Sequence, residues 1–589
     1  MLDYHAHFAV LRGLRAALPV MSAAHPFASK VADLCATADA EPDAAALGAF
    51  TDLVVDHAAS DGGELQLLET AADLWTRSLA LYEELVLARQ ELEGVLLQPT
   101  APNAVQQAQT AMGRLNGLRA NGMQISAEVE GLHALISPLP HLTPHGRQAD
   151  EPSKDWSWRD AFLGRRTDAF VRGVFENART PRASAFAFGV LSSYCGNVAG
   201  SAYLGSVVGG PRRTHRYRDR LARNAVGSAL QSQFHTPGVG DLATRIGFFN
   251  AGGAYAFPAD LAEVLQKATA AAWPGRTPPD WNLGLRRTVR HLQLLDMFQR
   301  PPLPAPPPLE LAQGGEQGGM LTILSGEGDP NVPTVGIGLD PDMTPSDPSG
   351  ADSKGKSGGG CLAILLIIIT LAIALLIYCI GKWTTDEKCS VDEFISDIQG
   401  SEEPDPRAPT SISQQELTSM ANPEAAGHLV QELFAVQMVL WQGFDSAAAF
   451  LAVTGLIYPD EHLMPSPLYQ QFLTTPAASA WPHRAEAVPD ESYHLYPTSP
   501  IEQPAAADPP FPANQPPFSF AVHWSHDQQR SAAETGHDLL GQILGGDQDS
   551  QNYDLDADRG YRHPCWDVAP GSSIADPVLA VDILPYEAE

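Results

Sequence analysis

Two long stretches of helical periodicity dominate the hydrophobic pattern of the chain. They cover residues 64–97 and 103–136, and the connection QPTAP between them is short and contains proline, as suits an antiparallel turn. In the second stretch, apolar or small residues recur at alternating steps of three and four, which is a heptad seam. The residues of the seam are Ala108, Ala111, Leu115, Leu118, Gly122, Ile125, Val129, Leu132 and Ile136. This pattern predicts a helical hairpin about 45 to 50 Å long. Two interpretations stay open, an ordinary pair of bundle helices and a projecting coiled-coil arm that binds a partner.

A third apolar stretch has no polar face at all. CLAILLIIITLAIALLIYCI, Cys361 to Ile380, contains no charged side chain, and Thr370 is its only strongly polar residue. Twenty such residues match the length that a helix needs to cross a hydrocarbon core of about 30 Å. The flanking segments GADSKGKSGGG and GKWTTDEKC do not resemble the interior of a domain. We therefore predict one transmembrane helix at 361–380.

The rest of the pattern predicts a mainly α protein with regions of different composition. A segment rich in proline and glycine is too poor in apolar residues to bury a core, and is expected to be a disordered tether. The predicted organisation is N-terminal helices at 1–62, the helical hairpin at 63–137, an all-helical domain at 150–300, the tether at 301–360, the transmembrane helix at 361–380, and a small, loop-rich acidic domain at 390–589.

Charge separates the two halves of the chain. The whole chain carries a net charge of −32, but residues 1–360 contribute only −7 and residues 381–589 contribute −25. Within the first half, residues 151–300 are basic, with a net charge of +9. Lysines close to the predicted span are balanced on its two sides, so the wider asymmetry decides the orientation. We expect a single-pass protein of the cell membrane with its N-terminal half in the cytoplasm and its C-terminal half outside, and the first twenty residues do not resemble a signal peptide.

Two of the six cysteines, Cys389 and Cys565, follow the predicted span. On the extracytoplasmic side they could form a disulfide that clamps the C-terminal region to its membrane-proximal stalk. Two unrelated free thiols are the alternative.

One helical stretch in the basic region carries a regular polar stripe. In AFAFGVLSSYCGNVAGS, residues 185–201, Ser193, Asn197 and Ser201 are spaced four apart and so share one face. Together with DWSWRDAFLGRRTDAFVRGVFENA before it and VVGGPRRTHRYRDRLARN after it, this stretch resembles the zinc-dependent phospholipase C family over about residues 155–233. The resemblance implies an all-helical phospholipase C-like domain.

The same resemblance argues against catalysis. The family's metal helix usually carries His, Asp and His at successive four-residue spacings, and the matching positions here are Ser193, Asn197 and Ser201. A hydroxyl or a neutral amide is a poor zinc ligand, so zinc could not lower the pKa of a bound water. The resemblance therefore implies a pseudoenzyme without a cofactor, and no metal site is expected. The residues that could still retain a metal, because the family also draws ligands from N-terminal segments, are His5, His7, Asp56 and His57.

The segment after this helix is rich in cations that suit phosphate, namely Arg212, Arg213, His215, Arg216, Arg218, Arg220 and Arg223. A basic patch on a tethered domain is attracted to an anionic membrane surface. Nucleic acid is not expected as a partner, because no aromatic side chains that could stack on bases are interleaved with the cations. A solvated face with internal salt bridges, for example to Asp219, is the alternative.

Three functions follow from these patterns. The first is a non-catalytic membrane adaptor or scaffold that binds a protein assembly through its N-terminal half and docks it at the cytoplasmic membrane. By analogy with the family, the assembly could be a bacterial contractile injection particle. The second is a membrane-tethered, zinc-dependent phospholipase C-like phosphodiesterase. The third is an effector that permeabilises membranes through its C-terminal half.

Overall fold

The computed structural model describes residues 2–136, 156–164, 166–208, 216–312, 423–474 and 532–546, with residues 415, 417, 418, 421 and 555. These residues are mainly helical, as predicted; among them there is no strand, and one isolated antiparallel bridge joins Phe249 to Tyr255. The predicted transmembrane helix at 361–380, the tether beyond residue 312, and both Cys389 and Cys565 lie outside the described residues. The chain forms two compact units. Unit 1 comprises residues 1–68, 139–296 and 452–589, and unit 2 comprises residues 69–138 and 297–451.

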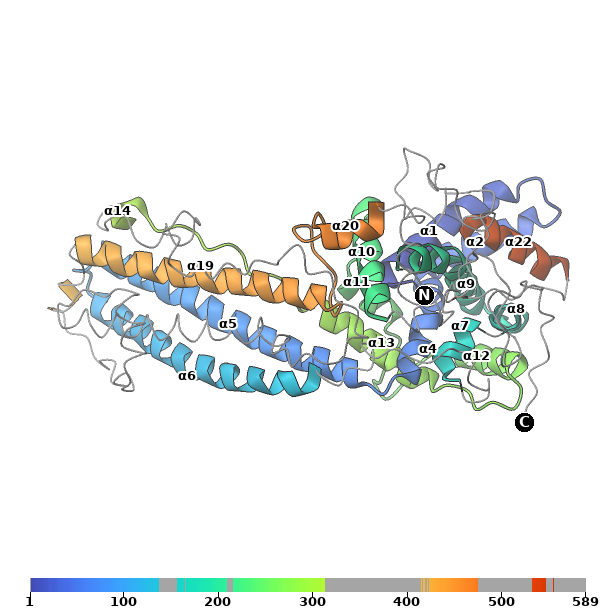
Figure 1. Cartoon of the computed structure of the whole chain (residues 1–589), viewed down its shortest axis with the longest axis horizontal. Coiled ribbons are helices and arrows are strands. Elements are labelled where there is room, and N and C mark those ends of the chain that lie inside the picture. Colours follow the sequence, from blue (N-terminus) through green and yellow to red (C-terminus); the bar gives the residue numbers. More distant parts are fainter. Residues whose placement is uncertain are drawn as a thin grey trace, which may run out of the picture. The chain divides into compact units, whose positions relative to one another are not determined.

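Unit 1 is built around helix α9 (Pro181–Val208), which is buried along most of its length. Neighbouring helices pack on it from several directions, as Figure 1 shows for α1, α2, α8 and α22. The other helices of unit 1 are α1 (Tyr4–Met21), α2 (Ala28–Ala40), α3 (Pro42–Ala49), α4 (Thr51–Ala59), α7 (Trp158–Gly164), α8 (Thr167–Asn177), α10 (Arg216–Phe234), α11 (Val239–Ile246), α12 (Ala259–Ala272), α13 (Trp281–Leu295), α20 (Pro467–Thr474) and α22 (Ala532–Gly545).

Helices α3 and α9 touch through their backbones. A Cβ atom at Gly48 would lie 2.2 Å from the carbonyl oxygen of Phe186, and a Cβ atom at Gly189 would lie 2.0 Å from that of Ala45. No other residue fits these two positions without moving a helix. The crossing fixes α4, which follows α3 directly, close to the middle of α9.

Segments that follow the predicted span pack on the N-terminal helices of unit 1. The side chain of Asn224 in α10 donates hydrogen bonds to the carbonyl oxygens of Gly455 and Ile457, each at 3.0 Å. Helix α20 packs on α10, and helix α22 packs on α1 and α9. Segments in direct contact lie on the same side of a membrane, so the predicted topology, with residues 390–589 across the membrane from the N-terminal half, is not supported.

Unit 2 is a bundle formed by α5 (Gly63–Leu97, of which residues 69–97 belong to this unit), α6 (Ala104–Ile136) and α19 (Pro423–Val453), with the short helix α14 (Leu309–Ala312). Figure 1 shows the three long helices side by side. The predicted seam is buried at each of its positions whose burial is described, from Ala108 to Ile125. Gln437 of α19 donates a hydrogen bond to the carbonyl oxygen of Leu85 at 3.2 Å. The two predicted helices are therefore members of a bundle rather than a two-helix arm.

The start of the predicted tether is held against this bundle. The carbonyl oxygen of Pro301 accepts a hydrogen bond from Trp441 at 3.0 Å, and that of Pro302 accepts one from Tyr82 at 2.9 Å. Arg89, whose side chain is 2% exposed, donates to the carbonyl oxygen of Ala305 at 2.7 Å. This part of the 301–360 prediction is therefore corrected, because the carbonyl groups of a proline-rich segment remain strong acceptors even where its nitrogens cannot donate.

Within the described residues, one helical segment is long and apolar enough to cross a membrane. It is Leu429–Val453 of α19, with a hydropathy of 1.2, and 60% of the tested window is buried inside the protein. Such a helix is compatible with a membrane protein, but the core helix of a soluble bundle has the same length and composition. Its Gln437 is fully buried against α5, as expected for a bundle helix.

Candidate functional site

A buried carboxylate forms the centre of unit 1. Asp52 of α4 is 2% exposed and accepts three hydrogen bonds. Its Oδ2 atom accepts from His7 Nε2 at 2.9 Å and from Asn197 Nδ2 at 2.7 Å, while its Oδ1 atom accepts from Ser193 Oγ at 3.1 Å. The donors come from α1 and from two successive turns of α9. We call these four residues the Asp52 cluster.

The carboxylate of Asp52 is stabilised in its ionised form, whereas the second ring nitrogen of His7, Nδ1, is buried and has no hydrogen-bond partner among the described residues. Burial alone would raise the pKa of Asp52, but the imidazole of His7 and the hydrogen bonds from His7 and Asn197 together lower this pKa below its ordinary value. Both polar atoms of the Asn197 amide form hydrogen bonds, because Nδ2 donates to Asp52 and Oδ1 accepts from the backbone N–H of Leu2 at 2.7 Å. The carboxylate is therefore ionised and is fully bound by groups of the protein.

The structure locates two of the three positions that the phospholipase C resemblance singled out. Ser193 and Asn197 both point at Asp52, so the polar stripe of α9 binds a carboxylate of the same unit. Ser201 also lies in α9, but its side chain is outside the described part. The hydroxyl of Ser193 donates to a carboxylate and not to an imidazole, so the cluster lacks the serine–histidine contact that activates a nucleophile.

The four residues that could have retained a metal have separate partners. His7 binds Asp52, and the Nδ1 atom of His5 lies 3.2 Å from the hydroxyl of Thr236. Asp56 forms an ion pair with Arg159, and His57 contacts Tyr4. Among the described residues, no three His, Cys, Asp or Glu side chains are arranged to hold a metal ion.

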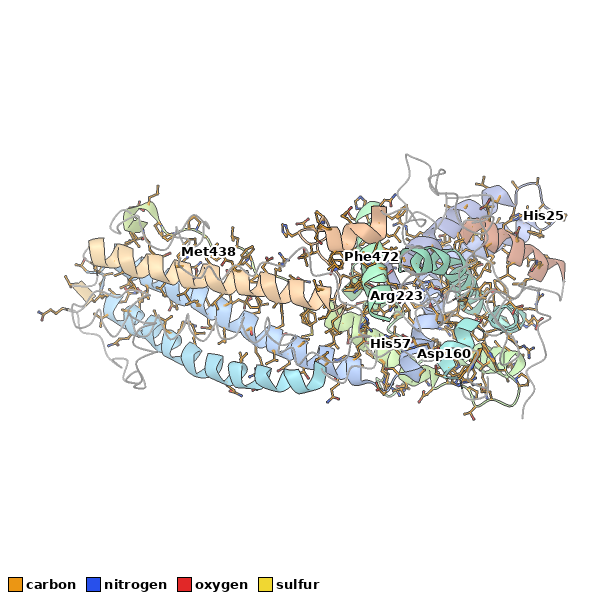
Figure 2. The ribbon with its side chains drawn as sticks, viewed as in Figure 1. His25, His57, Asp160, Arg223, Met438 and Phe472 are labelled. Carbon is orange, nitrogen blue, oxygen red and sulfur yellow. The ribbon has the colours of Figure 1, made fainter. Side chains whose placement is uncertain are left out.

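A second polar cluster lies beside the first and is less deeply buried. The hydroxyl of Tyr4 lies 3.1 Å from His57 Nε2 and 3.0 Å from His291 Nδ1. A phenol has one proton to donate, so one imidazole accepts it and the other donates to the phenol oxygen. Burial and the neighbouring His57 lower the pKa of His291 to about 3, which keeps this imidazole neutral. We call these three residues the Tyr4 cluster; Figure 2 labels His57.

Two cations of the predicted membrane-binding set are neutralised inside unit 1. Arg220 forms a double ion pair with Glu64, and Arg223, labelled in Figure 2, pairs with Asp219 at 2.7 Å. Their side chains are only 13% and 12% exposed, so these two guanidinium groups are engaged in internal salt bridges, including the pair with Asp219 that the alternative interpretation named, and are not presented to a membrane surface. Arg212, Arg213 and His215, and the side chains of Arg216 and Arg218, lie outside the described part.

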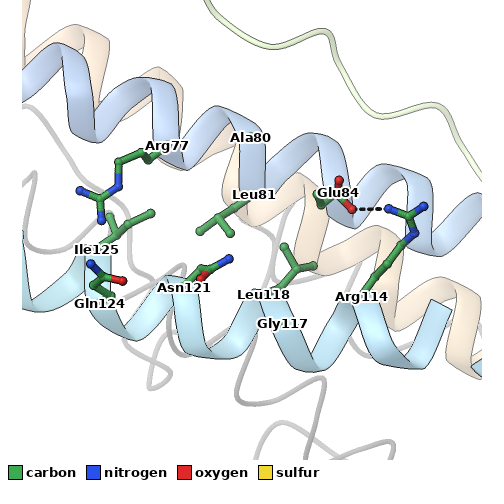
Figure 3. A pocket seen from close by; sticks show the side chains of 10 residues that line it. All are labelled: Arg77, Ala80, Leu81, Glu84, Arg114, Gly117, Leu118, Asn121, Gln124 and Ile125. Atoms are coloured by element: carbon green, nitrogen blue, oxygen red, sulfur yellow. Dashed lines mark hydrogen bonds and ion pairs between the residues drawn. The ribbon is translucent and has the colours of Figure 1, made fainter. Parts of the chain in front are cut away.

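Unit 2 carries an open groove between α5 and α6 (Figure 3). Its volume is about 580 Å³. Leu81, Leu118 and Ile125 form an apolar floor, and Arg77 and Arg114 lie toward its two ends. Arg77 pairs with Glu128, and Arg114 pairs with Glu84 at 2.6 Å.

The sequence analysis missed Asp52, Tyr4 and His291. One signal for Asp52 was available, since it is the one charged residue in a run, TDLVV, that is otherwise apolar or able to cap a helix. No local signal pointed to Tyr4 or His291, because 287 residues separate them in the chain.

No protein-family model, no curated protein and no solved structure matches this chain. The resemblance to zinc-dependent phospholipase C over residues 155–233 therefore remains a prediction from local patterns.

Proposed function

We propose that this chain is a non-catalytic adaptor that holds a protein assembly at a membrane. The observation that carries the proposal is the Asp52 cluster. At the helix positions where the resemblance would place metal ligands, Ser193 and Asn197 donate to a buried carboxylate instead. Polar groups that bind one another in this way support the fold, and the carboxylate of Asp52 already has three donors and is not open to a substrate.

The enzyme alternative would need a metal or an activated nucleophile in this place. His5, His7, Asp56 and His57 are each engaged with a different partner, so gathering them would require four contacts to break. Ser193 has no contact with an imidazole that could activate it, because its hydroxyl donates to Asp52, which also binds His7 and Asn197. These contacts favour the adaptor.

The membrane attachment in this proposal is the apolar segment 361–380. The contacts of α20 and α22 with α1, α9 and α10 join chain before this segment to chain after it. The proposal therefore puts these contacting segments together on the cytoplasmic face. Labelling of introduced cysteines at Lys267 and His462, both exposed, should find them on the same side. Labelling from opposite sides would contradict this topology.

The partner in this proposal is a protein assembly, with a bacterial contractile injection particle as its specific form. The groove of unit 2 is the surface best suited to the contact, because apolar floors between charged ends are typical of protein interfaces. Asn121 lies in the groove, whereas Gln106 is exposed on the same helix outside it.

Photo-crosslinking in the native cell tests this function. A photoreactive residue at position 121 should capture one recurrent multi-subunit assembly, and the same residue at position 106 should capture it far less. Equal capture from both positions would contradict the adaptor function. Hydrolysis of phospholipid by the chain would contradict it as well.

A further inference from the structure

A tight reversed turn between α11 and α12 exposes an aromatic side chain. The backbone of residues 247–257 folds back on itself, with Asn250 N–H donating to Ala254 O and Ala256 N–H donating to Phe248 O, each at 2.9 Å. Gly253 adopts φ +77°, which favours glycine. Phe249 is 64% exposed at the base of this turn. We call residues 247–257 the Phe249 turn.

The exposed ring is held in place. Phe249 stacks on Tyr255 with ring centroids 4.5 Å apart, and the Tyr255 hydroxyl accepts a hydrogen bond from Gln293 at 2.9 Å. At the other end of the turn, the backbone N–H of Phe257 donates to Asn282 at 3.0 Å. The two rings are therefore fixed in position, and the ring of Phe249 stays at the surface instead of packing into the core.

The helix that anchors the turn is basic on the same face. Asn282 and Gln293 of α13 hold the turn, and Arg286 and Arg290 lie between them in the sequence. The four residues follow one another at steps of four, four and three, so they share one face of the helix. Both arginines are exposed. The tip itself, from Asn250 to Ala254, has no charged residue. The exposed ring of Phe249, at the base of an uncharged tip, therefore lies beside a helix face that carries two cations.

We propose that the Phe249 turn is a membrane-interface contact that binds anionic lipid. The aromatic pair enters the headgroup region, where phenol and phenyl rings are favoured, and Arg286 and Arg290 contact lipid phosphate. An exposed aromatic ring together with two exposed arginines favours an anionic membrane surface, because its headgroup region accommodates aromatic rings and its phosphates attract cations. The inference does not depend on the adaptor function, because it stands on the turn and on α13 alone.

Hydrogen exchange of the full chain tests this inference locally, so that other membrane contacts of the chain do not obscure it. The probes are phosphatidylcholine vesicles with and without phosphatidylserine. Amides of residues 248–256 should exchange about tenfold more slowly with the anionic vesicles than with phosphatidylcholine alone. Phe249→Ser should abolish most of this protection, and Arg286→Gln should reduce it about fivefold.

Matched controls are available elsewhere on unit 1. Val20 is 76% exposed and Arg179 is exposed, so Val20→Ser and Arg179→Gln should leave the protection unchanged. Exchange in α9 should be equal in all variants, which would show that the fold is intact. Equal exchange with both kinds of vesicle, or the same loss in Val20→Ser as in Phe249→Ser, would overturn the inference. Protection of the turn without capture of an assembly at position 121 would refute the adaptor alone.

Discussion

Glycine has opposite roles in the two units. In unit 1, Gly48 and Gly189 lie where two helices touch, and a Cβ atom on either would collide with backbone. In unit 2, Gly113 and Gly117 lie in the middle of α6 with nothing within 4 Å of an added Cβ atom. Packing in unit 1 therefore requires glycine at Gly48 and Gly189, whereas the described contacts of the chain leave space for a side chain at Gly113 and Gly117 of α6.

Charge follows the same division. In unit 1, Asp52 is buried and bound on both oxygens by three donors. In unit 2, the ion pairs of Arg77 and Arg114 lie beside an open groove and are about one-third exposed. Exposed pairs contribute little to stability, and a buried carboxylate is costly once it loses a partner. Substitutions should therefore have large effects at the centre of unit 1 and small effects on α6.

The largest effect is expected at Asp52. Asp52→Ala leaves His7, Ser193 and Asn197 buried without their acceptor, and should lower the free energy of unfolding of unit 1 by about 3 to 5 kcal/mol. Hydrogen exchange of α9 amides measures this. Asp43→Ala is the control, because its carboxylate is 52% exposed and should matter by less than about 0.5 kcal/mol. Similar losses in the two variants would show that the Asp52 cluster does not stabilise unit 1.

Gly189→Ala should come next, with a loss of about 3 kcal/mol, because α3 and α9 must separate to admit the methyl group. The loss is measured by chemical denaturation, with hydrogen exchange of the α9 amides as the probe of unfolding. An unchanged free energy of unfolding would mean that α3 and α9 have more space between them than the short distance from position 189 to Ala45 indicates.

Acid should destabilise unit 1 through its buried histidines. Burial lowers the pKa of His5 to about 4, and burial with His57 lowers that of His291 to about 3. Below pH 6.5 the unfolded chain therefore binds protons that the folded chain does not, and stability falls as the pH falls. Burial raises the pKa of Asp3 to about 6, which offsets one of the two protons between pH 6 and 4.

The net change is about one proton, or about 1.4 kcal/mol per pH unit. His291→Gln should remove most of this slope in urea denaturation between pH 6 and 4, whereas His25→Gln, at an exposed position, should retain it. An unchanged slope in His291→Gln would rule out His291 as its source.

The smallest effect has the opposite sign. Gly117→Ala should stabilise α6 by about 0.5 to 1 kcal/mol, since alanine is the better helix former and no atom obstructs it. Hydrogen exchange of α6 amides measures the gain. A loss of stability would mean that another part of the chain covers this face.

Local pattern was enough to predict α5 and α6, and it failed at the centre of unit 1. The periodicity of residues 64–97 and 103–136 predicted α5 and α6 to within one residue, because helical spacing is a local property. The partners of Asp52 are contributed by residues as far as 145 positions away, so no window of sequence contains the cluster. The proline-rich start of the tether was misjudged for a related reason, since its partners Tyr82 and Trp441 lie far from it in the chain.

The central claim is that the polar centre of unit 1 is a structural network built on Asp52 and not a metal site. Unfolding of the purified full chain with and without added zinc, with phospholipid hydrolysis followed in the same samples, tests it most directly. We expect the unfolding midpoint to be unchanged by zinc and no turnover above that of the Asp52→Ala variant. A rise in the midpoint at one equivalent of zinc, accompanied by hydrolysis that Asp52→Ala abolishes, would contradict the account.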